Sequence, residues 1–157
     1  MSDQRAKTAG RQSKRLALSV KRLRPGARLP ERATPGATGY DLFACLDGDQ
    51  LEVGQAPMRV PTGIAIEAPP GFDVQVRPRS GLSARGVMVT FGTIDSDYRG
   101  EVLVTMFVLP YRGPHAVRPG DRIAQLVVSR IEDVALEEVQ ALSPTERDSG
   151  GHGSTGR

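Results

Sequence analysis

The longest regular alternation in the chain is Val102-Leu103-Val104-Thr105-Met106-Phe107-Val108, where residues 102, 104, 106 and 108 are all apolar. Apolar side chains at every second position are typical of a β-strand with one face on a core. The same alternation recurs in shorter form at Leu16, Leu18 and Val20, at Ile64 and Ile66, and at Phe72, Val74 and Val76. Ile123–Val128 is apolar except at Gln125, which predicts a strand buried on both faces.

Turn signals separate these segments. They are Pro25-Gly26, Pro35-Gly36, Pro70-Gly71 and Pro119-Gly120. Many short strands at this spacing predict an all-β fold, a jelly roll or distorted β-barrel. We expect one helical turn within Ser80–Gly86. The segment Glu132–Leu142 fits neither the helical nor the strand period, so its conformation stays open.

Length and composition describe one globular domain. The chain has 157 residues, of which 25% are charged and 38% hydrophobic. No apolar run approaches the roughly 18 residues that a membrane span needs, so we expect no membrane contact. The single cysteine, Cys45, lies in an apolar run and is expected to be free and buried. These features predict a reducing, cytoplasmic compartment.

Positive charge is concentrated at the N-terminus. Residues 1–32 hold ten Lys or Arg and two acidic residues, whereas residues 33–157 hold eleven basic and sixteen acidic residues. Residues 1–15 are almost without apolar side chains and are predicted to be a disordered basic arm. We do not expect a nucleic-acid site, because no aromatic or groove-reading residues accompany this charge. The predicted division is this arm, a β-domain at 16–142 and a flexible Gly-rich tail at 143–157.

Two segments have the composition of phosphate-binding loops. Arg79, Ser80 and Gly81 follow a strand, where an arginine fork and turn N–H groups suit a phosphate, although an exposed turn would read the same. Gly151–Gly156 matches G-x-G-x-x-G, but no helix can follow with only Arg157 left. Its glycines and hydroxyls, with Arg147 upstream, could still wrap an anion, or form a plain mobile tail.

Between Gly92 and Gly100 the chain carries two closely spaced carboxylates, Asp95 and Asp97. In an extended segment they would point the same way, and a carboxylate so placed can accept a proton from water. The alternative is a turn in which the aspartates serve as caps. His115 follows Gly113-Pro114 and is expected to lie solvated in a loop.

Taken in order, five segments make the chain resemble the trimeric dUTP pyrophosphatases (dUTPases). They are Thr38–Leu42, Pro78–Leu82, Gly92–Gly100, Gly120–Leu126, and Arg147 with Gly150–Gly156. The resemblance spans residues 16–157 and implies a jelly-roll fold of the β-clip type and a homotrimer. It implies that each active site takes the first, second and fourth segments from one subunit, the third from another, and the tail of a third subunit as a lid.

The resemblance also implies the reaction and the residue roles. Water attacks the α-phosphorus of dUTP and gives dUMP and pyrophosphate, which limits uracil incorporation into DNA and supplies dUMP for dTMP synthesis. Asp95 would activate the water, and Tyr98 would pack on the deoxyribose. A hairpin leading into Gly92, with Thr93 and Ile94, would read uracil.

Further implied binding residues surround the phosphates and the base. The triphosphate contacts would be Arg79, Ser80, Gln125, Arg147, Ser154 and Thr155, and Gly81 and Gly153 would be further substrate-binding residues. His152 stands where the family usually has a Phe that stacks on uracil. The implied cofactor is Mg²⁺, held mainly by phosphate oxygens and waters, with Asp41 in the outer shell.

Two other functions remain open at this point. A dCTP deaminase, monofunctional or bifunctional, shares the fold, but it needs a glutamate at the base, and by strand alternation Glu101 points away from Tyr98. A nucleotide-binding regulatory protein is the non-enzymatic alternative, although Asp95, Tyr98 and the tail are all retained.

Overall fold

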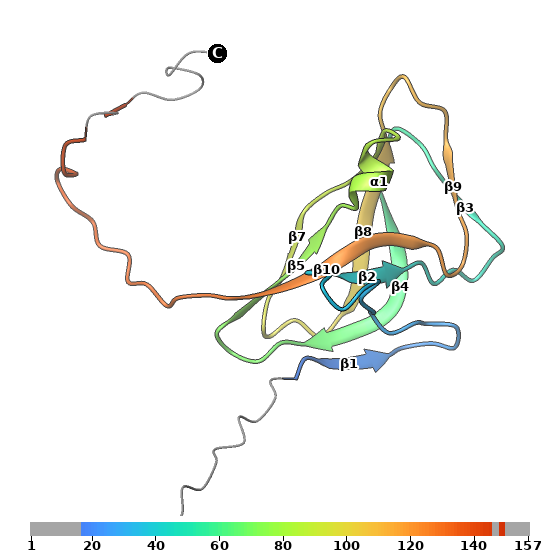
Figure 1. Cartoon of the computed structure of the whole chain (residues 1–157), viewed down its shortest axis with the longest axis horizontal. Coiled ribbons are helices and arrows are strands. Elements are labelled where there is room, and N and C mark those ends of the chain that lie inside the picture. Colours follow the sequence, from blue (N-terminus) through green and yellow to red (C-terminus); the bar gives the residue numbers. More distant parts are fainter. Residues whose placement is uncertain (1–16, 146–147, 150–157) are drawn as a thin grey trace, which may run out of the picture.

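The computed structural model describes residues 17–145 and 148–149, and its strands form three antiparallel sheets (Figure 1). The elements are β1 (Ser19–Arg22), β2 (Tyr40–Phe43), β3 (Leu51–Val53), β4 (Met58–Glu67), β5 (Phe72–Arg77), α1 (Ser80–Ser83), β6 (Val87–Val89), β7 (Gly92–Ile94), β8 (Glu101–Val108), β9 (His115–Val117) and β10 (Arg122–Arg130). Two sheets have four strands, in the orders β1-β4-β8-β6 and β2-β10-β5-β7, and β3 pairs with β9 in a ribbon. The all-β, jelly-roll-like prediction is confirmed.

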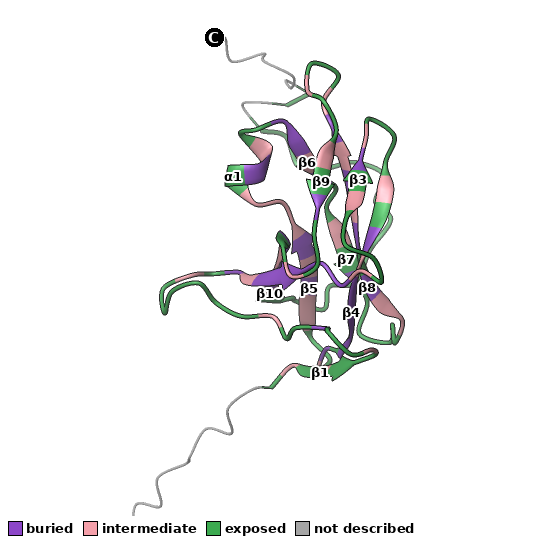
Figure 2. Ribbon diagram, turned by 90° about the vertical axis from the view of Figure 1, so that its right-hand side faces the viewer, coloured by how far each residue is buried: buried purple, intermediate pink, exposed green. Residues whose placement is uncertain are grey.

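One core joins the three sheets. It contains Val104 from the first four-stranded sheet, Val74 and Leu126 from the second, and Val117 from the ribbon, each without solvent exposure. Figure 2 shows this buried centre with the exposed turns around it. The apolar positions of β8 alternate inward as predicted, and β10 is buried on both faces at Ile123–Val127 except for the half-buried Gln125.

Two local predictions are settled by the structure. The helical turn predicted within 80–86 is present as α1, whose Leu82 side chain packs into the core. The open segment 132–142 forms neither helix nor strand. It is exposed along its length and leaves the barrel after β10 (Figure 1).

The expected hairpin before Gly92 is wrong. β6 pairs with β8 in one sheet, whereas β7 pairs with β5 in the other. Thr90 donates its N–H to the carbonyl of Thr105 on β8 at 3.0 Å. The segment after β6 therefore stays paired with β8 through Thr90. Thr90 and Phe91 therefore form a crossover between sheets, and Gly92–Ile94 presents its edge as a separate short strand.

The strand predicted from Leu16 begins later, at Ser19. Leu18 and Val20 are partly buried against the core, and Leu16 lies outside the described residues. The predicted arm at 1–15 also lies outside them, as do residues 146–147 and 150–157 of the predicted tail. Within the described part of the chain, no helix is long and apolar enough to cross a membrane. The division into arm, domain and tail stays a prediction.

Candidate active site

The first cluster of predicted site residues is built around Asp41 on β2. Nε of Arg79 lies 3.1 Å from Oδ1 of Asp41, and Nη1 of Arg122 lies 3.3 Å from Oδ2. Arg79 also donates through Nη1 to the backbone carbonyl of Arg122 at 2.9 Å. Asp41 is buried to 8% exposure, so two charged partners compensate its loss of water. The carboxylate thereby fixes two arginines at one corner of the barrel.

Strand pairing explains why this corner forms. Gln125 on β10 pairs with Asp41 on β2 and with Arg77 on β5. The first, second and fourth of the five segments of the resemblance, here called motifs, therefore meet at this corner. The Gln125 side-chain amide donates to the carbonyl of Pro78 at 2.9 Å. A side chain at Gly39 would displace the Gln125 amide from this position, because an added Cβ would lie 3.0 Å from Cδ of Gln125.

After Pro78 the chain turns into α1, which begins at the exposed Ser80 and Gly81. Leu82 anchors this turn in the core while Arg79 precedes it at the Asp41 corner. Ser80 and Gly81 therefore lie next to the two arginines. This corner of the barrel has the donors that bind a phosphate group: arginine forks, a hydroxyl and turn N–H groups.

The second cluster lies at β7 and the turn after it. One hollow is lined by Gly92, Thr93, Ile94, Asp95 and Tyr98, together with Val76 and the start of β8. Asp95 also lines a neighbouring hollow, with Asp97 and Phe72. The five predicted residues of the third motif are thus brought together around one pocket that mixes an aromatic ring, a carboxylate and a strand edge.

Residues 95–98 form a tight turn, so the extended reading of Asp95 and Asp97 is wrong. The N–H of Tyr98 donates to the carbonyl of Asp95 at 3.1 Å, and the Arg99 guanidinium binds the carbonyls of Ser96 and Tyr98 at 2.7 and 2.9 Å. These bonds within the turn outweigh strand alternation because no neighbouring strand pairs with these residues. Asp95 lines both the Tyr98 pocket and the neighbouring hollow, and Asp97 lines the neighbouring hollow.

Within one chain the two clusters lie at opposite ends of β5. Ile94, next to Asp95, pairs with Val74 near the start of β5, whereas Arg79 follows its last residue, Arg77. At about 3.3 Å per residue, the backbones of residues 95 and 79 are about 15–20 Å apart. One arginine side chain cannot span this distance to a phosphate that a water on Asp95 would attack.

His115 belongs to β9 and is partly buried, so the solvated-loop expectation is wrong. The ribbon register pairs it with Val53, and Nη2 of Arg112 lies 3.4 Å from its Nδ1. Burial lowers the pKa of His115 below its ordinary value, and the positive charges of Arg112 and Arg85 lower it further, against a weaker opposite effect of Asp121. These effects favour the neutral form of the imidazole over the charged form.

Arg122 is a site residue that the sequence reading did not single out. It precedes the buried Ile123 at the start of β10, and the missed signal was its position two residues after the Gly120 turn, beside the strand that carries Asp41. The predicted residues Arg147, His152, Gly153, Ser154 and Thr155 lie outside the described residues. Their roles stay predictions.

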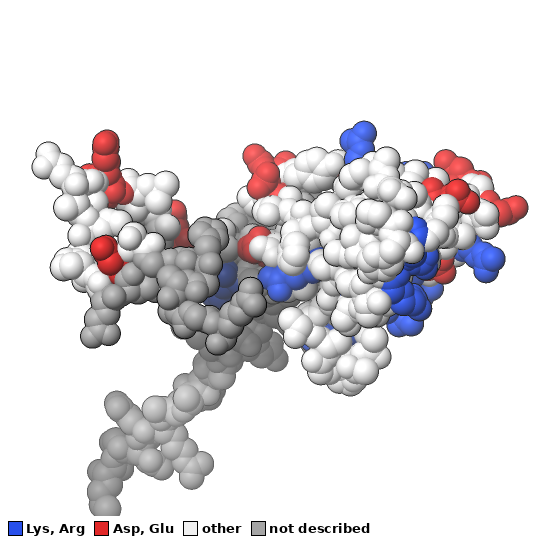
Figure 3. All heavy atoms as spheres, turned by 90° about the horizontal axis from the view of Figure 1, so that it is seen from above, with Lys and Arg blue, Asp and Glu red and all other residues white. Residues whose placement is uncertain are grey.

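Two further features of the described residues bear on the chemistry of the site: the distribution of charged side chains and the grouping of possible metal ligands. On the face shown in Figure 3, basic and acidic side chains lie next to one another over the barrel. Among residues 17–145 and 148–149 there is no group of three or more His, Cys, Asp or Glu that could hold a metal ion.

The chain matches known proteins over most of its length. The model of the family described as dUTPase matches residues 26–156. A deoxyuridine 5'-triphosphate nucleotidohydrolase from Syntrophotalea carbinolica is 45% identical over 148 residues, 91% of this chain and 99% of the relative. The one from Hydrogenobaculum sp. is 46% identical over 142 residues, 88% of this chain and 97% of the relative.

Solved structures agree with the fold. A dUTPase mutant of Staphylococcus bacteriophage 80alpha, solved with dUpNHpp, has a TM-score of 0.75 at 26% identity and covers 90% of this chain and 99% of its own. A dUTPase mutant from phage phi11 of S. aureus, whose structure reveals the coordination of a structural Mg(II) ion, has a TM-score of 0.70 at 24% identity, covering 80% of this chain and 97% of its own.

Proposed function

The chain belongs to the dUTPase family, and on that basis we propose that it hydrolyses dUTP to dUMP and pyrophosphate by attack of water on the α-phosphate. The observation that carries the proposal is the pocket in which Asp95 and Tyr98 lie with the edge of Gly92–Ile94. This pocket offers a surface for a nucleoside and, at its rim, a carboxylate for the water. A cytoplasmic location stays a prediction.

Asp95 is proposed to orient the attacking water and accept its proton. Its position after β7 is fixed by the turn to Tyr98, and it is exposed toward the pocket, so a water can reach it. A carboxylate within hydrogen-bond reach of the water is the requirement for general-base catalysis. Tyr98 is 44% exposed as a residue, and its ring is proposed to pack on the deoxyribose and to leave no room for a 2′-hydroxyl.

The corner around Asp41 is proposed to hold the triphosphate. Arg79, Ser80, Gly81 and Gln125 are the predicted contacts, and the structure adds Arg122. Arginine forks fit phosphate oxygens through paired N–H donors, and they neutralise charge that develops on the leaving pyrophosphate. The predicted tail residues would complete this set from outside the described part of the chain.

The residues present fit Mg²⁺ only as an ion carried by the substrate. Both oxygens of Asp41 face arginines, but a carboxylate oxygen has about two acceptor positions, so each can still accept a bond from a metal-bound water. Asp41 is therefore proposed to lie in the outer shell. When bound, Mg²⁺ would neutralise negative charge on the phosphates.

We propose a homotrimer in which sites are shared between chains. The support is the separation of the Asp95 pocket from the Arg79 corner, because each is incomplete without the other. The segment after β10 adds exposed apolar side chains that another copy could cover: Ile131, Val134, Leu136, Val139 and Leu142. Burial of such surface favours association.

The deaminase alternative receives no support from the site. The carboxylate of Glu101, the glutamate that directly follows the third motif in the sequence, accepts bonds from Arg24 and from the N–H of Gly63. A glutamate engaged in this way cannot also act on a base in the Tyr98 pocket.

The proposed function is tested by pyrophosphate release in Mg²⁺ from dUTP, dCTP, dTTP and UTP, each assayed separately. We expect release from dUTP and a loss of about 10³-fold or more in kcat for Asp95→Asn, because the base is removed while the shape is kept. Asp97→Asn is the matched control. It removes the same charge from the same turn, two residues away, and should cost much less.

Two other outcomes of this assay would each replace the proposed reaction with a different function. Ammonia release from dCTP would replace the proposal with deamination. Binding of dUTP without turnover of any nucleotide would replace it with a regulatory nucleotide-binding protein.

A further inference from the structure

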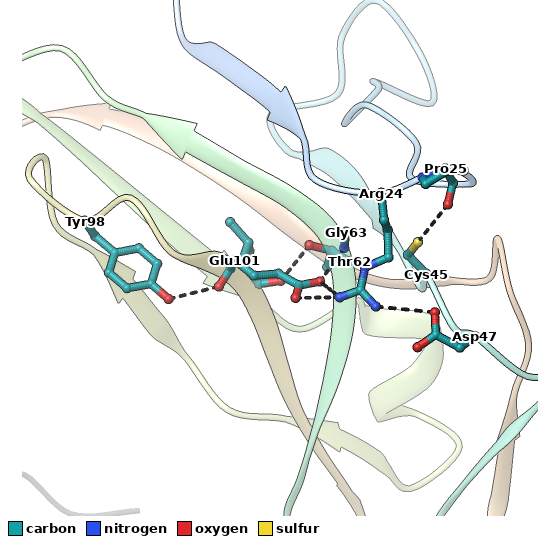
Figure 4. A network of polar contacts seen from close by, with 9 residues as sticks. Arg24, Pro25, Cys45, Asp47, Thr62, Gly63, Tyr98 and Glu101 are labelled. Atoms are coloured by element: carbon teal, nitrogen blue, oxygen red, sulfur yellow. Dashed lines mark hydrogen bonds and ion pairs between the residues drawn. The ribbon is translucent and has the colours of Figure 1, made fainter.

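We infer that Glu101 and Arg24 are positioning residues for the turn that carries Asp95 and Tyr98, an inference that rests on the function proposed above. Glu101 is the first residue of β8 and directly follows this turn. Figure 4 shows Glu101 between the Tyr98 phenol on one side and the Arg24 guanidinium on the other. The pair therefore links the catalytic turn to a distant part of the chain.

The Glu101 carboxylate is held by three hydrogen bonds. Nη2 of Arg24 donates to Oε1 at 2.8 Å and to Oε2 at 2.6 Å, and the backbone N–H of Gly63 donates to Oε1 at 2.7 Å. The side chains of Arg24 and Glu101 are 30% and 21% exposed, so water competes only in part with these bonds. Charge-assisted bonds in such a setting fix a side chain more firmly than bonds at an open surface.

The bond from Gly63 exists because β4 bulges there. The register between β4 and β8 shifts between Pro61 and Ala65, which turns the Gly63 N–H away from the regular ladder. Gly63 has φ +70°, and an added Cβ would lie 2.8 Å from both Cβ of Ala27 and Sγ of Cys45. Only glycine fits this conformation and space.

Arg24 reaches the same point from the end of β1. The N–H of Leu23 donates to the carbonyl of Gly63 at 2.8 Å, which brings the next residue over Glu101. Asp47 lies 3.6 Å from Nη1 of Arg24 on the solvent side. Burial alone lowers the pKa of an arginine, but the charge and hydrogen bonds of Glu101 hold the pKa of Arg24 above its ordinary value. The guanidinium stays charged at every working pH.

The backbone of Glu101 connects its anchored side chain to the pocket. Its carbonyl accepts the Tyr98 hydroxyl at 3.0 Å. The N–H of Tyr98 in turn binds the carbonyl of Asp95 at 3.1 Å. A displacement of Glu101 would therefore move the ring proposed to contact the sugar and loosen the turn that presents the water-activating carboxylate.

The kinetic test compares Glu101→Gln, Arg24→Met and their double variant in dUTP hydrolysis by the full chain with Mg²⁺. We expect each single variant to lower kcat about tenfold, because small displacements at a reacting centre are costly. The double variant should lose no more than either single variant, since both remove one interaction. Arg24→Lys should recover part of the loss of Arg24→Met.

The matched control is Glu52→Gln. It removes an exposed carboxylate from β3, in the ribbon with β9. We expect kcat within about twofold of the unmodified protein, as is usual for exposed substitutions.

A second readout does not depend on activity. The chain has three tyrosines, so ring-¹³C labelling gives three sets of NMR signals, and Tyr98 is assigned by Tyr98→Phe. We expect the Tyr98 signals alone to shift or broaden in Glu101→Gln and Arg24→Met. If the chain proved not to hydrolyse dUTP, this signal would still test the positioning.

The inference would be overturned by a lower melting temperature with unchanged kcat and an unmoved Tyr98 signal, since the pair would then only stabilise the fold. Additive losses in the double variant would also contradict it. Should Glu101→Gln fail to fold, Arg24→Met carries the same test, with Arg24→Lys, which keeps the charge, expected to lose less activity than Arg24→Met.

Discussion

Gly100 determines where the Tyr98 ring can lie. An added Cβ at this position would lie 2.9 Å from Cε2 of the ring and would overlap its hydroxyl. The ring therefore folds back over the backbone of residue 100 to reach the Glu101 carbonyl. A glycine next to the tyrosine is needed for packing, and the proposed sugar contact depends on it.

Gly100→Ala should therefore impair catalysis more than stability. The methyl group displaces Tyr98, and we expect kcat/KM for dUTP to fall by about 10–100-fold because the proposed sugar contact is misplaced. The turn is exposed, so the melting temperature should change little. Steady-state kinetics and thermal unfolding measure the two effects. Gly48→Ala, at an exposed turn where an added Cβ meets nothing within 4 Å, is the control.

At the scale of the elements, the strands could be predicted where the pattern is local. The alternation of residues 102–108 and the continuous apolar run of 123–128 reappear as the inward faces of β8 and β10. The crossover at Thr90 and Phe91 could not be predicted, because it depends on which distant strand each neighbour joins. The turn at Asp95 likewise depends on bonds formed by Tyr98 and Arg99.

His115 gives the ribbon of β3 and β9 a specific pH dependence. Its pKa is lowered in the folded state, so protons bind the unfolded chain more readily as the pH falls below the ordinary value of 6.5. The free energy of unfolding should therefore decrease between about pH 7 and pH 5. His115→Gln should lose part of this decrease. Urea unfolding at both pH values checks it, and an identical pH dependence in the two proteins would show that His115 plays no part.

At the scale of the whole molecule, the described chain holds two halves of a site that do not meet. The motifs that the resemblance places in one shared site lie apart within one chain, at the Asp41 corner and the Asp95 pocket, about 15–20 Å apart along β5. The resemblance implied this division, whereas local spacing alone could not predict it, because the division follows from sheet topology. The exposed apolar side chains beyond β10 fit the same explanation, in which other copies complete the structure.

The most direct test of shared sites mixes two inactive variants. Asp95→Asn and Arg79→Ala should each abolish dUTP hydrolysis alone. If Asp95 of one chain works with Arg79 of another, each mixed trimer formed by unfolding and refolding the two together regains about one working site in three. We predict that pyrophosphate release returns in the co-refolded mixture and not when the separately refolded variants are combined. A co-refolded mixture that forms mixed trimers but stays inactive would contradict the shared site.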